Sequence, residues 1–185
     1  RVYACWLTRK EASSTLNAPH NHISQNASLR VNDQELKNRK SLGLTPAWRL
    51  NIKNCLKYIN SQKEKIYWED IKQGKNLLNL DQFGDVIIAR KDILTSYHLS
   101  VTVDDNSDGV THIIRGNDLE SYTNIHRLLQ VLLNLRETKW FHHKLVKDTN
   151  GKRIAKRSNS KLTIKELRKN GYSAKEVIKL AKSST

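Results

Sequence analysis

The 185-residue chain contains no methionine, only two cysteines and no long apolar run. No run approaches the ~20 residues that span a bilayer, and the N-terminus lacks the continuous apolar stretch of a signal peptide. Cys5 and Cys55 lie far apart and indicate neither a disulfide framework nor a metal-binding motif. These absences argue against a membrane protein and against a secreted disulfide scaffold. We therefore expect a cytoplasmic protein in a reducing environment.

The missing methionine also bears on the ends of the chain. A complete translation product is expected to show an initiator or a plausible trimmed start, whereas this chain begins at Arg1. The sequence therefore predicts a truncated protein. Its length still suffices for one domain with a core, and its 37% hydrophobic content lies above the disordered extreme.

Acidic residues are scarce, because 18 Asp and Glu stand against 33 Lys and Arg, which gives a formal net charge of +15. This excess favours a polyanionic partner, with nucleic acid as the first candidate, although a merely soluble basic surface explains the composition equally well. Five aromatic residues stand among the basic residues of segments 37–75 and 136–182, namely Trp48, Tyr58, Tyr67, Trp68 and Trp140. Such a mixture suits RNA, but these aromatics more often belong to a core or an interface.

Local patterns in the first half predict short elements. Thr8 and Glu11 form a capping box, which predicts the start of a helix. Residues 17–41 are polar and weakly periodic, so we expect a loop with one helical stretch near 33–40. Segment 46–52 predicts a strand entered through proline, and segment 67–74 fits a strand or a turn.

The second half shows clearer periodicity. Segment 85–90 (DVIIAR) is a short apolar run, which predicts a central strand. Segment 97–103 alternates like a strand but also fits a helix. Segment 109–116, flanked by glycines, predicts another strand. Apolar residues at helical spacing over 119–135 predict the clearest helix of the chain.

Two further capping boxes lie near the C-terminus. Thr163 with Glu166 and Ser173 with Glu176 predict two helices, and Gly171 between them can end the first.

The alternation of strands and helices predicts an α/β layer fold around a mostly parallel sheet. In such sheets ligands bind at the carboxyl ends of the strands. The acidic pair Asp104-Asp105 and the pair Arg115-Gly116 lie at or near predicted element ends, so they can share a cleft. The acids can bind Mg²⁺ or act as bases, but capping of the next element or support of Arg115 is favoured.

The order of features in segment 84–119, followed by the basic motif GKRIAKR at 151–157, resembles the second half of the catalytic domain of class I glutamyl-type tRNA synthetases. Within this family it is most similar to the short glutamyl-queuosine tRNA(Asp) synthetases, which share the form Arg-Gly-x-Asp-Leu at 115–119. The resemblance implies an α/β fold, namely the C-terminal part of a class I aminoacyl-tRNA synthetase Rossmann-like catalytic domain with an inserted subdomain. It implies an inserted or connective subdomain over 1–80 and the second half of the catalytic domain over 81–185. It also favours a helix for 97–103.

Arg115 ends a predicted strand, where a guanidinium can hold a carboxylate in a fork of two hydrogen bonds. By resemblance, Arg115 helps to bind the glutamate substrate and Tyr97 lines the same pocket. The spacing from Tyr97 to Arg115 agrees with the family pattern without a gap. Taken alone, Arg115 also fits a surface salt bridge and Tyr97 also fits a packing role in the core.

A second set of residues follows in the basic loop. Arg153, Lys156 and Arg157 resemble the KLSKR loop of class I synthetases, with Lys156 on its second lysine. The resemblance implies that all three bind ATP and that Lys156 is catalytic, because a basic loop can neutralise charge that develops during adenylate formation. Arg153 replaces the first lysine and Ala155 replaces the serine. Alone, the pentapeptide also fits a solvated basic turn.

Two features of the family are missing from the sequence. Queuosine enzymes often carry Cys-x-Cys before Thr-Arg, but Leu7 replaces the second cysteine here, and tetrahedral zinc needs four donors. We therefore expect no zinc site. A His-Ile-Gly-His-like helix start that binds ATP phosphates is also absent, since His20 and His22 lie in a polar loop without glycine. This absence predicts that an N-terminal part of the active site is lacking.

The implied reaction uses glutamate, ATP and Mg²⁺ to form glutamyl-adenylate and then transfers glutamate to queuosine in tRNA(Asp). We expect a monomer with tRNA and glutamate as partners and no membrane partner. Two alternatives stay open. One is a fragment of a discriminating glutamyl-tRNA synthetase, and the other is a non-catalytic remnant that binds tRNA.

Overall fold

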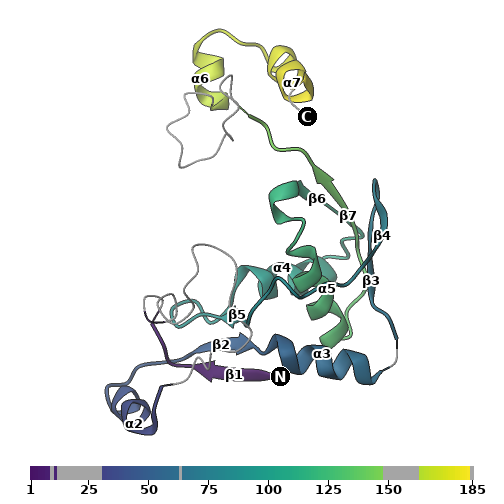
Figure 1. Ribbon diagram of the computed structural model, residues 1–185. Helices are drawn as coiled ribbons and strands as arrows, with labels where there is room; N and C mark the ends of the chain where they lie inside the picture. Colours follow the sequence, from purple (N-terminus) through teal and green to yellow (C-terminus); the bar gives the residue numbers. More distant parts are fainter. Residues whose placement is uncertain (9–10, 12–30, 63, 148–162, 184–185) are drawn as a thin grey trace.

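The computed structural model describes residues 1–8, 11, 31–62, 64–147 and 163–183, and these form two β-sheets with helices packed against them (Figure 1). The first sheet has the order β1-β2-β5, with the strands β1 (Val2–Cys5), β2 (Ala47–Leu50) and β5 (Val86–Ala89). The second has the order β4-β3-β7-β6, with the strands β4 (Gly74–Leu77), β3 (Tyr67–Asp70), β7 (Lys139–His143) and β6 (His112–Gly116).

The second sheet confirms the expected parallel core. Strands β3, β7 and β6 run parallel, and β4 adds an antiparallel edge strand. The first sheet is antiparallel throughout, because β2 pairs in that sense with both β1 and β5. The predicted α/β class is therefore correct, and the antiparallel sheet is an addition to it.

The prediction of a central strand over 85–90 is wrong for the described part of the chain. Strand β5 lies at the edge of the first sheet, and all four of its residues are only half-buried. Val86 and Ile88 pack against the core on one face, which is enough to account for the apolar run. A short apolar segment thus does not require a strand neighbour on each side.

The ambiguous segment 67–74 forms strand β3 and a tight turn into β4. The Asp70 carboxylate accepts hydrogen bonds from the backbone N–H groups of Lys72 (2.8 Å) and Gln73 (3.0 Å). Gly74 takes a φ of +84°, which side chains rarely adopt. The strand and turn alternatives are therefore both correct, one for each end of the segment.

The helices match most of the predicted segments. They are α2 (Asp33–Ser41), α3 (Ile52–Ser61), α4 (Tyr97–Ser107), α5 (Thr123–Leu132), α6 (Ile164–Lys169) and α7 (Ala174–Ser183). The helical interpretation of 97–103 is confirmed and the strand alternative is wrong. The predicted helix over 119–135 starts later, because a 3₁₀ turn (Asn117–Leu119) precedes it. None of the described helices is long and apolar enough to cross a membrane.

The predicted caps are present where they can be described. Thr8 and Glu11 exchange both hydrogen bonds of a capping box, and so do Ser173 and Glu176. Gly171 has a φ of +85° and ends α6, as expected from its place between the two C-terminal helices. Most of the helix predicted after Thr8 lies outside the described residues.

The core joins the two sheets through α3 and α5, which lie one above the other in Figure 1. Its buried members are Leu50, Ile52, Cys55, Ile59, Leu80, Ile125, Leu128 and Leu129. On the second sheet, Trp140 is fully buried and meets Trp68 edge to face at 6.1 Å. Trp68 and Trp140 are therefore core residues, whereas Trp48 and Tyr67 stay exposed.

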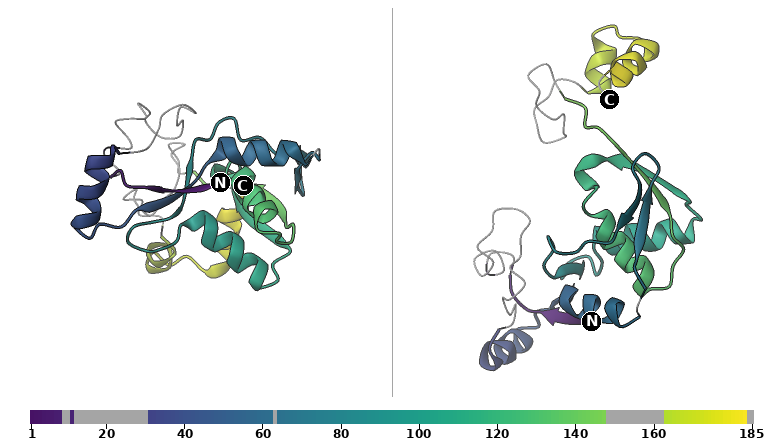
Figure 2. Two further views of the ribbon diagram at one scale, coloured as in Figure 1. Left: turned by 90° about the horizontal axis from the view of Figure 1, so that it is seen from below. Right: turned by 45° about the vertical axis from the view of Figure 1, so that its right-hand side comes forward.

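Helices α6 and α7 contact each other and lie beyond β7, apart from the first sheet in the right-hand view of Figure 2. Each sheet takes strands from both sides of residue 80, since β2 pairs with β5 and β3 pairs with β7. The expected division into 1–80 and 81–185 stays a prediction about functional units.

Replacement of Asn124 by alanine is expected to lower the free energy of unfolding by about 2 kcal/mol. The Asn124 side-chain oxygen accepts from the Trp68 indole (3.1 Å) and from the Asn79 backbone N–H (2.9 Å), and both donors lose this partner. Urea unfolding of Asn124→Ala measures the loss. Asn60→Ala, an exposed site on α3, is the matched control and should change stability by less than ~0.5 kcal/mol. Equal effects in the two variants would contradict the bridging role.

Candidate functional site

Arg115 lies next to the carboxyl end of the parallel strand β6, the edge where α/β sheets bind ligands. Its side chain is 9% exposed. A Cβ at Gly116 would lie 2.5 Å from an Asp118 carboxylate oxygen and 2.8 Å from a Leu145 methyl group, so both side chains would have to shift to admit it. The Arg-Gly pair thus places a buried cation beside a stretch of backbone against which the Asp118 and Leu145 side chains pack closely.

The guanidinium is held by neutral acceptors. Its Nε donates to Nε2 of His142 (3.2 Å), one η nitrogen donates to Nδ1 of His126 (2.8 Å), and the other donates to the Thr123 hydroxyl. These partners come from β7 and from α5. The second sheet and the helix that covers it therefore build the site together.

No ion pair involves Arg115 among the residues that the structure describes. Burial lowers the pKa of Arg115, while Tyr97 and the charges of Asp105 and Asp118 act in the opposite direction. A guanidinium with neutral partners and partial burial attracts an anion. The arrangement can therefore bind a carboxylate or another small anion.

Tyr97 opens α4 and is brought near Arg115 by the fold. Ser96 caps the helix, and the Tyr97 ring meets the His126 ring at 5.8 Å. The Tyr97 side chain is 52% exposed, so it borders the site from the solvent side. The core-packing alternative for Tyr97 is therefore wrong, as is the surface salt bridge for Arg115.

The acidic pair lies in the last turn of α4, near an element end as the sequence predicts. Asp105 is half-buried, and burial together with the neighbouring Asp104 charge raises its pKa, which the charge of Arg115 partly offsets. Asp104 is exposed. Asp105 thus interacts electrostatically with Arg115 but forms no ion pair with it. This agrees with the expectation that the acidic pair supports Arg115.

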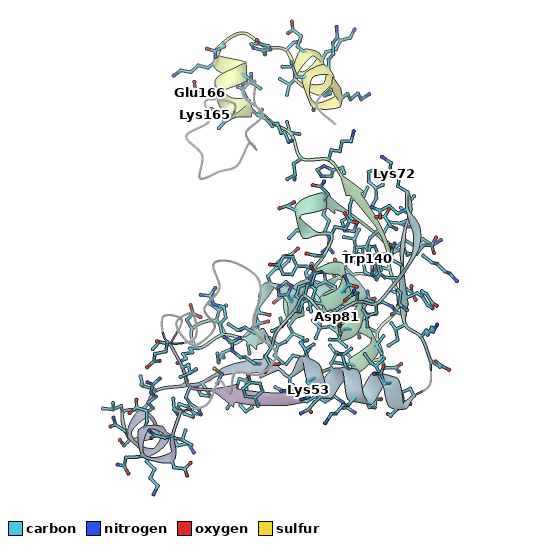
Figure 3. The ribbon with its side chains drawn as sticks, in the orientation of Figure 1. Lys53, Lys72, Asp81, Trp140, Lys165 and Glu166 are labelled. Carbon is cyan, nitrogen blue, oxygen red and sulfur yellow. The ribbon has the colours of Figure 1, made fainter. Side chains whose placement is uncertain are left out.

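Several buried polar groups that no sequence motif indicates surround Arg115. We call them, together with Arg115, the arginine network, and its members are Asp70, His98, Arg115, Thr123, His126 and His142. A signal was present in α5, where Thr123, His126 and Gln130 follow the i, i+3, i+7 spacing of one helix stripe. All three are buried. Figure 3 shows side chains crowded around Trp140, which precedes His142 by two residues on β7 and shares its face of the strand.

The hydrogen-bond directions in the network follow from Arg115, which can only donate. His126 accepts at Nδ1, so its proton sits on Nε2 and is donated to Nδ1 of His98 at 3.0 Å. Burial first, and then the charges of Arg115 and His98, lower the pKa of His126 to about 2. Burial and the Arg115 charge also lower the pKa of His98. Both imidazoles are therefore neutral at physiological pH.

Arg153, Lys156 and Arg157 lie outside the described residues, so their place relative to Arg115 stays a prediction. The same holds for His20 and His22. Within the described ranges, no three His, Cys, Asp or Glu side chains gather as metal ligands. The expected Mg²⁺ has no ligand set there, and we assign it no step.

Comparison with known proteins supports a single family. The sequence profile described as "tRNA synthetases class I (E and Q), catalytic domain" matches residues 7–182. The chain is 46% identical over 97 residues to a "Glutamyl-Q tRNA(Asp) synthetase" of Rhodobacter capsulatus, an overlap of 52% of this chain and 34% of that protein. It is 30% identical over 176 residues to "Glutamate--tRNA ligase 2" of Bartonella tribocorum, which covers 92% of this chain and 38% of the relative.

The fold is shared with solved structures. The glutamate-tRNA synthetase of Elizabethkingia anophelis superposes with a TM-score of 0.60 at 19% identity, over 88% of this chain and 34% of that one. A glutamate tRNA ligase from Elizabethkingia meningosepticum, solved in complex with its amino acid, gives a TM-score of 0.59. The chain thus spans little more than a third of the length of these relatives.

Stability is expected to fall as the pH drops below about 6.5, the ordinary pKa of histidine. The unfolded chain then binds protons that folded His126, with its pKa lowered to about 2, does not bind. Each such histidine contributes a loss of up to about 1.4 kcal/mol per pH unit, and His98 acts in the same sense. Urea unfolding between pH 7 and pH 4.5 measures the slope, which His126→Gln should flatten.

The control for this slope is His112→Gln, because His112 is exposed on β6 and lies outside the arginine network. It should leave the pH dependence as in the parent chain. If His126→Gln kept the full slope, His126 would not be the neutral buried base that its contacts indicate.

Proposed function

Because this chain belongs to the class I tRNA synthetases for glutamate and glutamine, we propose that its protein activates glutamate with ATP and transfers it to queuosine of tRNA(Asp). The match over residues 7–182 confirms the resemblance to glutamyl-type synthetases. The 46% identity to a glutamyl-Q tRNA(Asp) synthetase supports the queuosine acceptor within that family. The observation that carries the proposal is the buried guanidinium of Arg115 at a ligand-binding strand end, without an ion pair among the described residues.

Arg115 holds a carboxylate of the bound glutamate. Three of its five N–H groups are taken by His142, His126 and Thr123, so its orientation is fixed before the substrate arrives. The remaining N–H groups are available to the Tyr97 hydroxyl and to a carboxylate. Preorganised donors of this kind bind without a reorganisation cost.

Adenylate formation follows on the bound substrate. A carboxylate oxygen of glutamate attacks the α-phosphorus of ATP, and pyrophosphate leaves. In our proposal Arg153, Lys156 and Arg157 bind the triphosphate, and Lys156 neutralises the charge that develops on the phosphates. The hydroxyl of the queuosine base then attacks the activated carbonyl, and AMP leaves.

Pyrophosphate–ATP exchange that depends on glutamate is the direct test, on the full-length protein that contains this sequence. We expect exchange without tRNA, since queuosine-type enzymes activate glutamate in its absence. Exchange only in the presence of tRNA would favour a discriminating glutamyl-tRNA synthetase. No exchange in either case, together with tRNA binding that weakens steeply with salt and ignores ATP, would favour a tRNA-binding remnant.

Replacement of Arg115 by alanine should raise the KM for glutamate by a factor of about 30 or more, with a smaller effect on the KM for ATP. The reason is that a charge-assisted fork of hydrogen bonds contributes at least ~2 kcal/mol. Steady-state exchange at varied glutamate measures the change. An unchanged KM would remove Arg115 from the glutamate site.

Two further variants serve as comparisons for Arg115→Ala. Arg90→Ala removes an exposed arginine that pairs with Asp92, and it should leave the glutamate KM unchanged. Lys156→Ala should lower the exchange rate at saturating glutamate with little change in the glutamate KM, because its proposed contact is with the phosphates.

A further inference from the structure

We propose that Asp70 is a positioning residue for Arg115 and acts by fixing the tautomer of His142. The inference rests on the proposed glutamate-binding role of Arg115. Asp70 itself lies on β3, separated from Arg115 by the whole His142 ring, and so it acts through another residue.

Asp70 is a buried carboxylate whose oxygens are all engaged as acceptors. It is 1% exposed. One oxygen accepts from the backbone N–H groups of Lys72 and Gln73, and the other lies 2.8 Å from Nδ1 of His142. Burial alone would raise the pKa of Asp70, but the hydrogen bonds from His142, Lys72 and Gln73 together lower it. The carboxyl group is therefore ionised and cannot donate a proton to His142.

This acceptor fixes the state of the His142 ring, which is equally buried. Because Asp70 accepts at Nδ1, the ring proton must sit there, and Nε2 is left with a free lone pair. Nε2 lies 3.2 Å from Nε of Arg115 and 3.1 Å from the Thr123 hydroxyl. Arg115 can only donate, so Nε2 must accept.

Thr123 completes the ordering. Its oxygen accepts from an η nitrogen of Arg115, so its own proton is free to point at Nε2 of His142. Two donors thus converge on one unprotonated nitrogen. A proton on Nε2 would face both of them, and Arg115 would lose its Nε partner while Thr123 would have to turn. The tautomer therefore decides whether the guanidinium keeps its orientation.

The Asp70→Asn variant removes the negative charge and changes the His142 tautomer while keeping the shape of the side chain, because asparagine has nearly the same size as aspartate. The backbone N–H groups of Lys72 and Gln73 require an oxygen at their side of the group. The amide NH₂ must then face Nδ1 of His142 and donate to it. This moves the ring proton to Nε2, against the two donors.

Two readouts test the proposal. Long-range ¹H–¹⁵N NMR of the histidine rings distinguishes the two neutral tautomers, and steady-state exchange gives the glutamate KM and kcat. We expect the Nδ1–H tautomer for His142 in the parent protein and the Nε2–H tautomer in Asp70→Asn. We expect the variant to raise the glutamate KM about tenfold with kcat much less affected. Asp92→Asn makes the same chemical change in an exposed ion pair and should alter neither readout.

The outcomes are separable from those of the proposed function. An Nε2–H or a doubly protonated His142 in the parent protein would overturn the inference, and this measurement needs no variant to fold. A shifted tautomer in Asp70→Asn with an unchanged glutamate KM would also overturn it, while the glutamate site would stand. A parent protein that shows no glutamate-dependent exchange but has the Nδ1–H tautomer would instead overturn the proposed function.

Discussion

A guanidinium removed from water needs acceptors for its N–H groups, because a buried charge without partners strongly destabilises a fold. Arg115 obtains these acceptors from the end of β7 and from one face of α5. The bonds to Thr123 and His126 hold the charge and also tie α5 to the parallel sheet, whereas the bond to His142 links two strands of that sheet. The position of α5 is therefore set by a polar requirement at its N-terminal end as much as by the apolar core.

Helix α5 can both pack in the apolar core and supply acceptors to Arg115, because it buries one apolar and one polar stripe of side chains. Ile125, Leu128 and Leu129 belong to the apolar core shared with α3. Thr123 and His126 face the guanidinium, and further along the helix Gln130 donates to the buried Thr138 hydroxyl at 3.1 Å. A helix with buried polar groups along one stripe has little freedom to rotate or slide, since each polar group would lose its partner. This restraint keeps the ligand-binding edge of the sheet in one arrangement.

Local rules were enough to predict much of the fold from the sequence. The capping boxes at Thr8 and Ser173 depend only on residues three apart, and the apolar stripe of α5 depends only on helical spacing. The helical state of 97–103 required the family resemblance, because its apolar pattern fits two periods. The edge position of β5 depends on which strand it pairs with, and no local pattern encodes that choice.

The candidate site was also predictable only in part. Arg115 and Tyr97 were identifiable through their motifs, and the structure brings both to the His126 ring. Asp70 and His126 were not identifiable from the sequence. An aspartate before a turn is commonly a turn-capping residue, and a histidine on a helix is commonly a packing residue, so neither one indicates a functional site by itself. Their importance arises from contacts across the fold, such as the one between Asp70 and His142, which are 72 positions apart.

The ordered protons of the arginine network explain why an anion suits this place. Arg115 donates in both directions, toward His142 on one side and toward His126 on the other, and each histidine is neutral because it must accept. The only carboxylate in the network, Asp70, lies behind the His142 ring and offsets the positive charge from that side alone. On the side of Tyr97, the guanidinium meets neutral rings and a hydroxyl. The charges of Asp105 and Asp118 also act on it, although Arg115 forms no ion pair among the residues that the structure describes. In the proposed function, a bound carboxylate on that side gives Arg115 the ion pair that the described residues do not supply, and it does so without moving a proton in either histidine.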